Sequence, residues 1–447
     1  MAVNSELSTR SGYTFYPEEL LRDAAAHLKE QAHISICGLP GTGKSTFVRQ
    51  LADLEVRKRL GLDQNYLMVL FDGQEFAHSS LEHVWGAILA AFKRACSSLS
   101  EVCKKDDAQR VKEEDFKEAL HNLRHYRLVL VLGNCSGLHM GPERNLCHNL
   151  LHLNIMHRPT LIMIRNPACN REILSEFVPI DVTLSSEQAL QFLDQALPQW
   201  GGDRALKNKL SREILGWVGG NLSLLDGVCY RAAEVGGNLP SRRAYPDFSR
   251  AVYDSCLRDA EPLFAAWWRI LEEREQMVLL AMDELQRLTT SWQDAMKELS
   301  RKGLVQEQGD RHLISPKMFS DYVSKQPATR SAGPFQLDLR RIQIVHVDGK
   351  PRSLSRGQAC AFFRLIVHRD QVVSCSYLYA DLHSPYGYIT EDKMHEMDAS
   401  SMESVDRGLD ELRKTLTVDK LIERISLDDN APLIGYRLAV SSPGQDG

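Results

Sequence analysis

Residues 33–54 read HISICGLPGTGKSTFVRQLADL and contain the pattern G-x-x-x-x-G-K-[ST], formed by Gly38, Gly43, Lys44 and Ser45. Glycines let backbone N–H groups wrap around a phosphate, and the N-terminus of a following helix adds positive partial charge there. A lysine in this position reaches the β- and γ-phosphates of a nucleotide, and the serine hydroxyl ligates Mg²⁺. The pattern therefore predicts a loop that holds ATP or ADP together with Mg²⁺.

The segments on both sides of this loop are the ones that such a site requires. HISIC alternates like a strand, and STFVRQLADL has helical spacing at Phe47, Leu51 and Leu54. With both flanks in place, nucleotide binding is favoured over a glycine-rich turn that has no ligand. The expected nucleotide-binding residues are Gly38, Gly41, Thr42, Gly43, Lys44, Ser45 and Thr46, and Ser45 is the expected Mg²⁺ ligand.

The composition is ordinary for a soluble globular protein. The chain has 447 residues, of which 43% are hydrophobic and 25% charged, and this length predicts about two to four domains. The net charge of −5 gives no general reason to expect nucleic acid or an anionic membrane as a partner. Since no apolar run approaches the roughly 18 residues that a membrane helix needs, we expect no membrane segment.

The cysteines indicate a reducing compartment. Ten of them are scattered without the spacing of a disulfide framework, and Cys37, Cys229 and Cys360 sit within apolar segments. The first ten residues, MAVNSELSTR, show no signal peptide. Both features predict reduced thiols and a cytoplasmic protein.

Four more strand-like segments follow the loop, and helical segments lie between most of them. The strand-like segments are NYLMVLFDG (65–73), LVLVL (128–132), TLIMIRN (160–166) and VPIDVTL (178–184). Strands that alternate with helices indicate an α/β fold, in which a parallel sheet is covered by helices on both faces.

This order of elements, together with the loop, resembles the AAA+/STAND class of P-loop ATPases. The resemblance implies a P-loop NTPase core at residues 11–185. LSSEQALQFLDQAL and LGWVGGNLSLLDGVCYRAAE resemble the small helical lid of the class, expected at 186–248. The segment 249–326 resembles its winged helix.

The strand LVLVL ends where this class carries its second acidic motif, an Asp that holds the magnesium shell and a Glu that activates water. Here Gly133 and Asn134 occupy the two positions, and a neutral amide does not accept a proton from water. Asp72 ends a strand that the class places at the outer edge of the sheet. We therefore expect nucleotide binding with slow or absent hydrolysis, unless an acid enters the site from elsewhere in space.

Two further positions bear on the nucleotide. Arg165 and Asn166 follow the fourth strand, where the class has a polar residue that senses the γ-phosphate; a solvated strand end is the alternative interpretation. The lid contains the sequence GGN (219–221) but has Leu222 where STAND proteins usually have a proline near the adenine. This departure leaves the placement of the base open.

One cluster has a spacing that zinc uses, because His148 and His152 are four residues apart and share a helical face. Cys147 and His157 flank them, but apolar residues dominate the segment. We expect a helix with histidines at its edge rather than a metal site.

The C-terminal part resembles a second kind of module. PATRSAGP (327–334) has the composition of a linker. Two strands around Asp348-Gly349, three amphipathic segments and a final hairpin then follow in the order of the OmpR/PhoB-type winged helix, over residues 335–440. This family inserts its third helix, expected here at 404–416, into the major groove of DNA and lays its hairpin along the minor groove.

The resemblance implies that the candidate cations for double-stranded DNA are Arg407, Arg413, Lys414 and Arg437. Residues 334–447 contain 14 Lys and Arg but 17 Asp and Glu, a net charge of −3, which is unfavourable for binding phosphates. A winged helix that docks proteins is therefore the alternative. The polar insert 383–404 is interpreted either as a partner-binding loop or as a disordered segment.

Taken together, these features predict a P-loop NTPase core and helical lid followed by two winged-helix domains. We expect a nucleotide-dependent regulator, similar to a transcription regulator, that binds DNA through its C-terminal module. The alternative is a catalytically silent scaffold that holds a nucleotide and assembles protein partners or self-associates. ATPase activity is expected to be weak at best.

Overall fold

A computed structural model describes residues 17–62, 65–72, 81–95, 111–133, 150, 159–165, 176–197, 204–235, 243–288, 293–309, 311–332, 335–368, 371, 373–383, 399–416, 422–426 and 434–438. The chain divides into two compact units, Met1–Leu263 and Phe264–Gly447.

The first unit is built on a five-stranded sheet with the order β2-β3-β4-β1-β5. All neighbouring strands are parallel, which confirms the expected α/β fold. β2 lies at one edge, as the strand order of the resembled class predicts. The strands are β1 (His33–Cys37), β2 (Tyr66–Asp72), β3 (Arg127–Gly133), β4 (Thr160–Arg165) and β5 (Phe177–Asp181).

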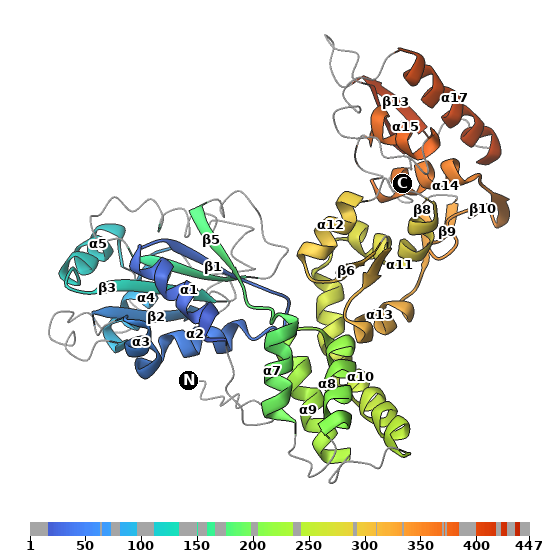
Figure 1. Cartoon of the computed structure of the whole chain (residues 1–447). Helices are drawn as coiled ribbons and strands as arrows, with labels where there is room; N and C mark the ends of the chain where they lie inside the picture. Colours follow the sequence, from blue (N-terminus) through green and yellow to red (C-terminus); the bar gives the residue numbers. More distant parts are fainter. Residues whose placement is uncertain are drawn as a thin grey trace. The chain divides into compact units, whose positions relative to one another are not determined.

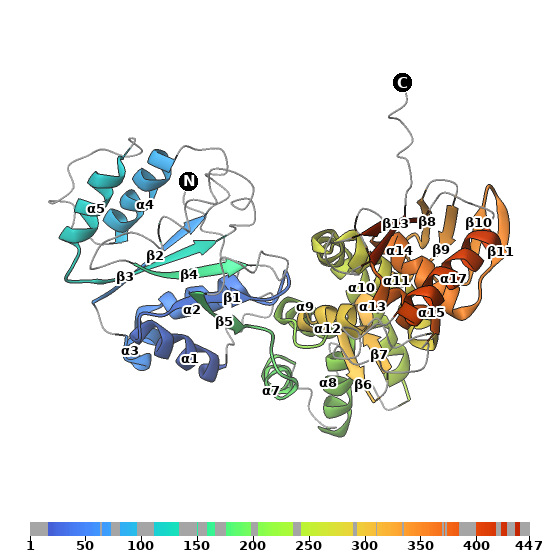
Figure 2. The ribbon, with the colours of Figure 1, turned by 90° about the horizontal axis from the view of Figure 1, so that it is seen from above.

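Helices cover both faces of this sheet (Figure 2). One face carries α1 (Glu18–Lys29), α2 (Lys44–Ala52) and α3 (Leu54–Leu60), and the other carries α4 (Leu81–Ala95) and α5 (Glu113–Asn122).

The aliphatic run of β3 is explained by the helices that cover both faces of the sheet. Its leucines 128, 130 and 132 pack in the core on the side of α4 and α5, where Trp85 and Phe116 lie with ring centroids 4.4 Å apart. The intervening Val129 and Val131 are also buried. A strand buried on both faces needs apolar residues at every position, which is why LVLVL does not alternate.

The lid region contains α7 (Ser186–Ala196), α8 (Arg204–Val218), α9 (Leu222–Val235) and the long helix α10 (Tyr245–Ile270). The domain boundary expected between residues 248 and 249 falls inside α10, which runs without a break from Tyr245 to Ile270. The division between the two compact units lies further along the same helix, after Leu263.

The second unit begins with the end of α10 and a helical group (Figure 1). Phe264 of α10 packs at 5.7 Å from Phe319, measured between ring centroids. The elements that follow α10 are α11 (Glu273–Leu288), α12 (Gln293–Arg301), the antiparallel pair β6 (Val305–Gln308) and β7 (Arg311–Ile314), and α13 (Lys317–Ser324).

The segment expected as a linker, 327–334, contains a strand instead. β8 (Thr329–Ala332) pairs antiparallel with β9 (Phe335–Asp338). A sheet of order β11-β10-β9-β8 results, completed by β10 (Ile344–Val347) and β11 (Lys350–Ser353). The turn-forming residues of segment 327–334 favoured a linker. In the structure, however, the middle of this segment forms backbone hydrogen bonds with β9 and is therefore a strand.

The rest of this unit has two helices, a short strand, a third helix and a final hairpin. These elements are α14 (Arg356–Val367), β12 (Val373–Ser374), α15 (Cys375–His383), α17 (Ala399–Leu416), β13 (Ile422–Ser426) and β14 (Ile434–Leu438). The helix expected at 404–416 thus begins earlier, inside the expected insert. α14 also packs against α11, so the segments on either side of β8 share one compact unit.

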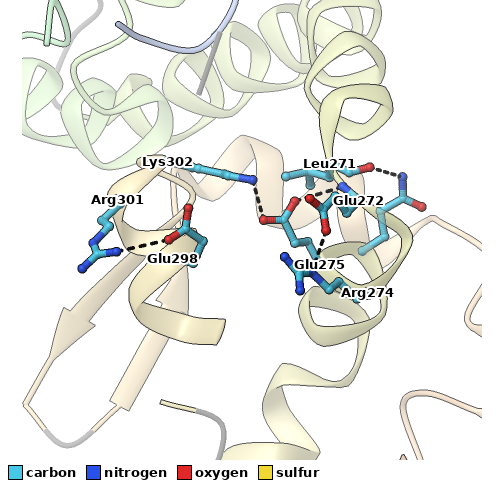
Figure 3. Close-up of polar contacts among 8 residues, drawn as sticks. Leu271, Glu272, Arg274, Glu275, Glu298, Arg301 and Lys302 are labelled. Carbon is cyan, nitrogen blue, oxygen red and sulfur yellow. Dashed lines mark hydrogen bonds and ion pairs between the residues drawn. The ribbon is translucent and has the colours of Figure 1, made fainter. Parts of the chain in front are cut away.

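A buried ion pair joins α11 to the residue that follows α12 (Figure 3). Lys302 Nζ donates to Oε1 of Glu275, and both side chains are 8% exposed. The other carboxylate oxygen of Glu275 accepts the N–H of Glu272 at 2.9 Å and so caps α11. The neighbouring pair Arg301–Glu298 has an exposed arginine and is expected to contribute little to stability.

Replacing Lys302 with methionine is expected to lower the free energy of unfolding by about 3–5 kcal/mol, because it leaves the Glu275 carboxylate buried without its partner. The matched control is Arg301→Met, expected to cost less than about 1 kcal/mol. Chemical denaturation measures both. Equal losses in the two variants would contradict a stabilising role that depends on burial.

Candidate functional site

The residues of the G-x-x-x-x-G-K-[ST] pattern form a tight loop between β1 and α2. Gly38 closes against the far side of this loop, where a Cβ atom would lie only 2.4 Å from Oγ1 of Thr42. Gly43 has φ 91° and is the N-cap of α2. The loop therefore leads directly into the N-terminus of a helix, the arrangement that binds phosphates through free N–H groups.

The side chains of the loop are ordered by its own carbonyl groups. Lys44 Nζ donates to the carbonyl oxygens of Gly38 at 2.7 Å and Leu39 at 2.9 Å. Thr42 is 2% exposed, and its hydroxyl also donates to the Leu39 carbonyl at 2.9 Å. The ammonium group of Lys44 is thus held across the loop.

The structure brings together all seven residues expected to bind nucleotide, in the loop and the first turn of α2. Ser45 is exposed at the start of that helix and Thr46 is half-buried. Helix α2 is shorter than expected, because it ends at Ala52 and Asp53 caps a new helix, α3.

The end of β3 has no acidic side chain at Gly133, although a Cβ atom could be added there without a clash. A Cβ atom at Gly133 would lie 3.6 Å from the carbonyl oxygen of Phe71, its nearest neighbour, which is an ordinary contact. Asp72 is the strand partner of Gly133 on the outer strand β2. Asn134 and Asn166 lie outside the described residues, and Arg165 is described as the last residue of β4.

A carboxylate that the sequence analysis passed over lies on the opposite side of β1. Asp181 ends β5 and is the strand partner of Cys37, the residue before the loop. Its Oδ1 accepts the backbone N–H of Thr183 at 2.8 Å. Asp181 therefore shapes the turn from the sheet into the lid. The sequence signal that could have indicated this residue is its position at the end of the strand-like segment VPID.

The GGN sequence of the lid lies against the loop, which the sequence analysis did not anticipate. Asn221 is buried, and its side-chain amide donates to the carbonyl oxygen of Pro40 at 3.3 Å. Leu222, which stands where a proline was expected, is also buried. The lid and the candidate phosphate site are thus in direct contact.

The candidate cations for DNA differ in their surroundings. Arg407 and Lys414 of α17 are exposed. Arg413, another of the candidate cations, forms an ion pair with Asp410 on the same helix at 2.5 Å. Arg437 pairs through its backbone with Glu423 in the final hairpin. Asp406 accepts the hydroxyl of Tyr436 at 2.6 Å and so ties α17 to that hairpin.

The described cysteines are free thiols. Burial raises the pKa of Cys256 and of Cys360 to about 12, so both remain protonated near neutral pH and are poor nucleophiles. Cys37, Cys229 and Cys375 are likewise not in disulfides.

The Cys147, His148, His152 and His157 cluster lies outside the residues that the structure describes. Among those it does describe, no three His, Cys, Asp or Glu side chains gather closely enough to hold a metal ion. The same residues include no helix with the length and apolar character needed to cross a bilayer.

Comparison with known families identifies the first part of the chain. Residues 26–171 match the family described as an AAA domain. This region is a P-loop nucleotide-binding domain of the AAA type. It contains the loop, α2 and the strands β1 to β4. Comparison with curated proteins finds no match.

One of the solved structures compared shows a similar fold over most of the chain. The Walker-type ATPase PABY2304 of Pyrococcus abyssi aligns with a TM-score of 0.50 and 12% identity, over 70% of this chain and 97% of that one. The ORC1 protein of Aeropyrum pernix in complex with DNA has a TM-score of 0.38 and 16% identity, over 70% and 94%. At 12% identity the likeness to the Pyrococcus abyssi protein concerns the fold alone.

Proposed function

We propose that this protein is a nucleotide-dependent regulator that binds ATP or ADP with Mg²⁺ and hydrolyses ATP slowly or not at all. The observation that carries the proposal is the loop itself, in which Lys44 is held across a turn that opens into the N-terminus of α2. A helix N-terminus, the backbone N–H groups of a glycine-rich loop and an ammonium group together suit a polyphosphate.

The hydrogen-bond donors and the hydroxyl of the loop fit a nucleotide with its Mg²⁺. The N–H groups of Gly41 and Gly43 would bind the phosphates, and Lys44 would neutralise the β- and γ-phosphates. The exposed hydroxyl of Ser45 would be the ligand for Mg²⁺. The bound metal would supply charge neutralisation at the phosphates.

Slow hydrolysis follows from the end of β3. Gly133 provides no carboxylate for the magnesium shell, and Asn134 is a neutral amide at the position of the base. Losing a general base typically costs about 10²–10⁴ in rate. Binding is retained, because the groups that hold the phosphates belong to a different segment. The bound nucleotide then acts by shifting the equilibrium between arrangements of core, lid and the following domains.

We further propose that the C-terminal module is a winged helix that binds double-stranded DNA. The order α14, β12, α15, α17 and a final hairpin, preceded by a four-stranded antiparallel sheet, supports this assignment. So does the exposure of Arg407 and Lys414, seven residues and about two turns apart on α17. The helical segment 249–326 is proposed as the first winged helix.

Replacing Arg407 and Lys414 together with alanine is expected to weaken binding to all DNA sequences and to reduce the salt slope by about 2, since each phosphate contact contributes about 0.9. Arg413→Ala, whose charge is already paired with Asp410, is expected to reduce the slope by less. A salt titration on genomic fragments measures both. Binding that is absent at low salt, or unchanged in the double variant, would assign the module to protein partners.

The second candidate is a scaffold that keeps its nucleotide and assembles proteins. The pairing of Arg413 with Asp410 and the net charge of −3 for residues 334–447 favour it. Exchange of ATP for ADP separates the two functions. A regulator changes its small-angle scattering or hydrogen exchange between the two nucleotides, whereas a scaffold gives the same result with both.

A further inference from the structure

The turn between α8 and α9 holds the backbone of the phosphate-binding loop. Besides the bond from Asn221 to the Pro40 carbonyl at 3.3 Å, the backbone N–H of Ser223 donates to the Gly41 carbonyl at 2.9 Å. Asn221 is 4% exposed, and a hydrogen bond shielded from water is electrostatically stronger than an exposed one. Two successive carbonyl groups of the loop are therefore bound by the lid.

These bonds also orient the N–H groups of the loop. Both peptides, Pro40–Gly41 and Gly41–Thr42, are trans, and a trans peptide directs its C=O and N–H to opposite sides. Holding the two carbonyls toward the lid turns the N–H groups of Gly41 and Thr42 away from it. The Thr42 N–H donates to the Leu39 carbonyl within the loop at 3.2 Å, whereas the Gly41 N–H belongs to the set that would bind the phosphates in the proposed site.

Glycines on both sides allow the two backbones to approach. Gly41 has φ 82°, and a Cβ atom there would lie 3.2 Å from Oδ1 of Asn221 and 3.1 Å from Cδ2 of Leu263 on α10. A Cβ atom at Gly220 would lie 1.8 Å from the carbonyl oxygen of Leu184. The N–H of Leu184 in turn donates to the Gly220 carbonyl at 3.0 Å. The lid turn is thus fixed against the end of the core as well as against the loop.

We propose that Asn221 is a positioning residue of the nucleotide site, which holds the lid against the phosphate-binding loop and keeps the Pro40–Gly41 peptide, with the Gly41 N–H, in its binding orientation. This inference rests on the proposed binding of nucleotide at residues 38–46. Coupling between two binding equilibria is reciprocal. The lid contact therefore strengthens nucleotide binding, and bound nucleotide strengthens the lid contact by the same factor.

The two ends of the Asn221 side chain have separate roles, and one substitution separates them. Nδ2 binds Pro40, whereas Oδ1 accepts the N–H of Leu224 at 3.2 Å and caps α9. Serine also caps helices well, but its side chain is one atom shorter and has no amide. Asn221→Ser therefore keeps the cap and removes the bond to the loop.

In the full chain, Asn221→Ser is expected to weaken the binding of a fluorescent ADP analogue by about 3- to 10-fold, the effect of losing one hydrogen bond. Asn208→Ser is the matched control, because it makes the same substitution at an exposed position of the lid helix α8. Its affinity is expected to equal that of the wild type. Equal ADP affinity in Asn221→Ser and wild type would overturn the proposal while leaving nucleotide binding intact.

Hydrogen exchange distinguishes a positioning role of Asn221 from a purely structural one, because only a positioning role makes protection of the lid depend on ADP. In the wild type, ADP is expected to increase the protection of the first turn of α9, and in Asn221→Ser this increase is expected to shrink. A variant that only loosens the lid would lose the same protection with and without ADP. If Asn221→Ser does not fold, the wild type decides alone: ADP binding without added protection there would overturn the coupling. A wild type that binds no ADP would overturn the proposed function itself.

Discussion

Lys44→Ala is expected to lower the affinity for ATP and ADP by about 10- to 100-fold. Hydrogen bonds to charged groups contribute about 1.5–3 kcal/mol each, and Lys44 is the cation on which the proposed phosphate site depends. Its Nζ atom is within 3 Å of two loop carbonyls, so little rearrangement is needed for it to reach a phosphate beside the loop. Alanine removes the charge and keeps a good helix former at the start of α2.

Thermal unfolding with and without nucleotide measures this effect. A ligand that binds only the folded state stabilises it by RT ln(1 + [L]/Kd), which is about 2.7 kcal/mol at a hundred times Kd. At the same nucleotide concentration, a 10- to 100-fold weaker Kd leaves about 1.4 to 0.4 kcal/mol, so Lys44→Ala is expected to lose half or more of that stabilisation. Lys58→Ala is the control, since Lys58 lies on α3 and pairs with Glu55 at 2.8 Å. Full ATP-induced stabilisation of Lys44→Ala would place the site elsewhere.

Gly133→Asp combined with Asn134→Glu is expected to raise ATP turnover by about 10²-fold or more. The aspartate would restore a carboxylate for the magnesium shell, and the glutamate would restore a base, which typically contributes about 10²–10⁴ in rate. Steric hindrance at Gly133 is not expected, because an added Cβ atom there would make only ordinary contacts.

The matched control for this pair is Gly133→Asn with Asn134→Gln, which adds side chains of similar size without charge. It is expected to leave turnover at the wild-type level. Steady-state phosphate release measures all three proteins. An unchanged rate in the Asp and Glu variant, with ATP still bound, would mean that other catalytic groups are missing as well and would favour the scaffold.

The sequence was sufficient for the sheet and the loop because their signals are local. Each strand is an apolar run, and the glycines, Lys44 and Ser45 stand at fixed spacing between one strand and one helix. The edge position of β2 followed from resemblance to a class with a known strand order. The composition around residue 330 was misleading, because β8 is polar and is defined by its hydrogen bonds to β9.

Contacts between distant segments were outside the reach of the sequence. Asn221 is 181 residues from Pro40. The GGN sequence that contains it predicted only a departure at Leu222, where a proline was expected, and no contact with the loop. The ion pair between Arg413 and Asp410 is local, since the two residues are three apart on α17, but it depends on rotamers that spacing does not specify.

A single-turnover experiment with radiolabelled ATP, Mg²⁺ and the protein in excess tests the central claim most directly. It follows, in the same sample, how much ATP is bound and how fast it is converted to ADP. We expect ATP to be bound and to remain largely intact, with a rate far below about 1 s⁻¹, the lower end of typical enzyme turnover. Conversion near about 1 s⁻¹, or no bound ATP at all, would contradict a nucleotide site that binds without rapid hydrolysis.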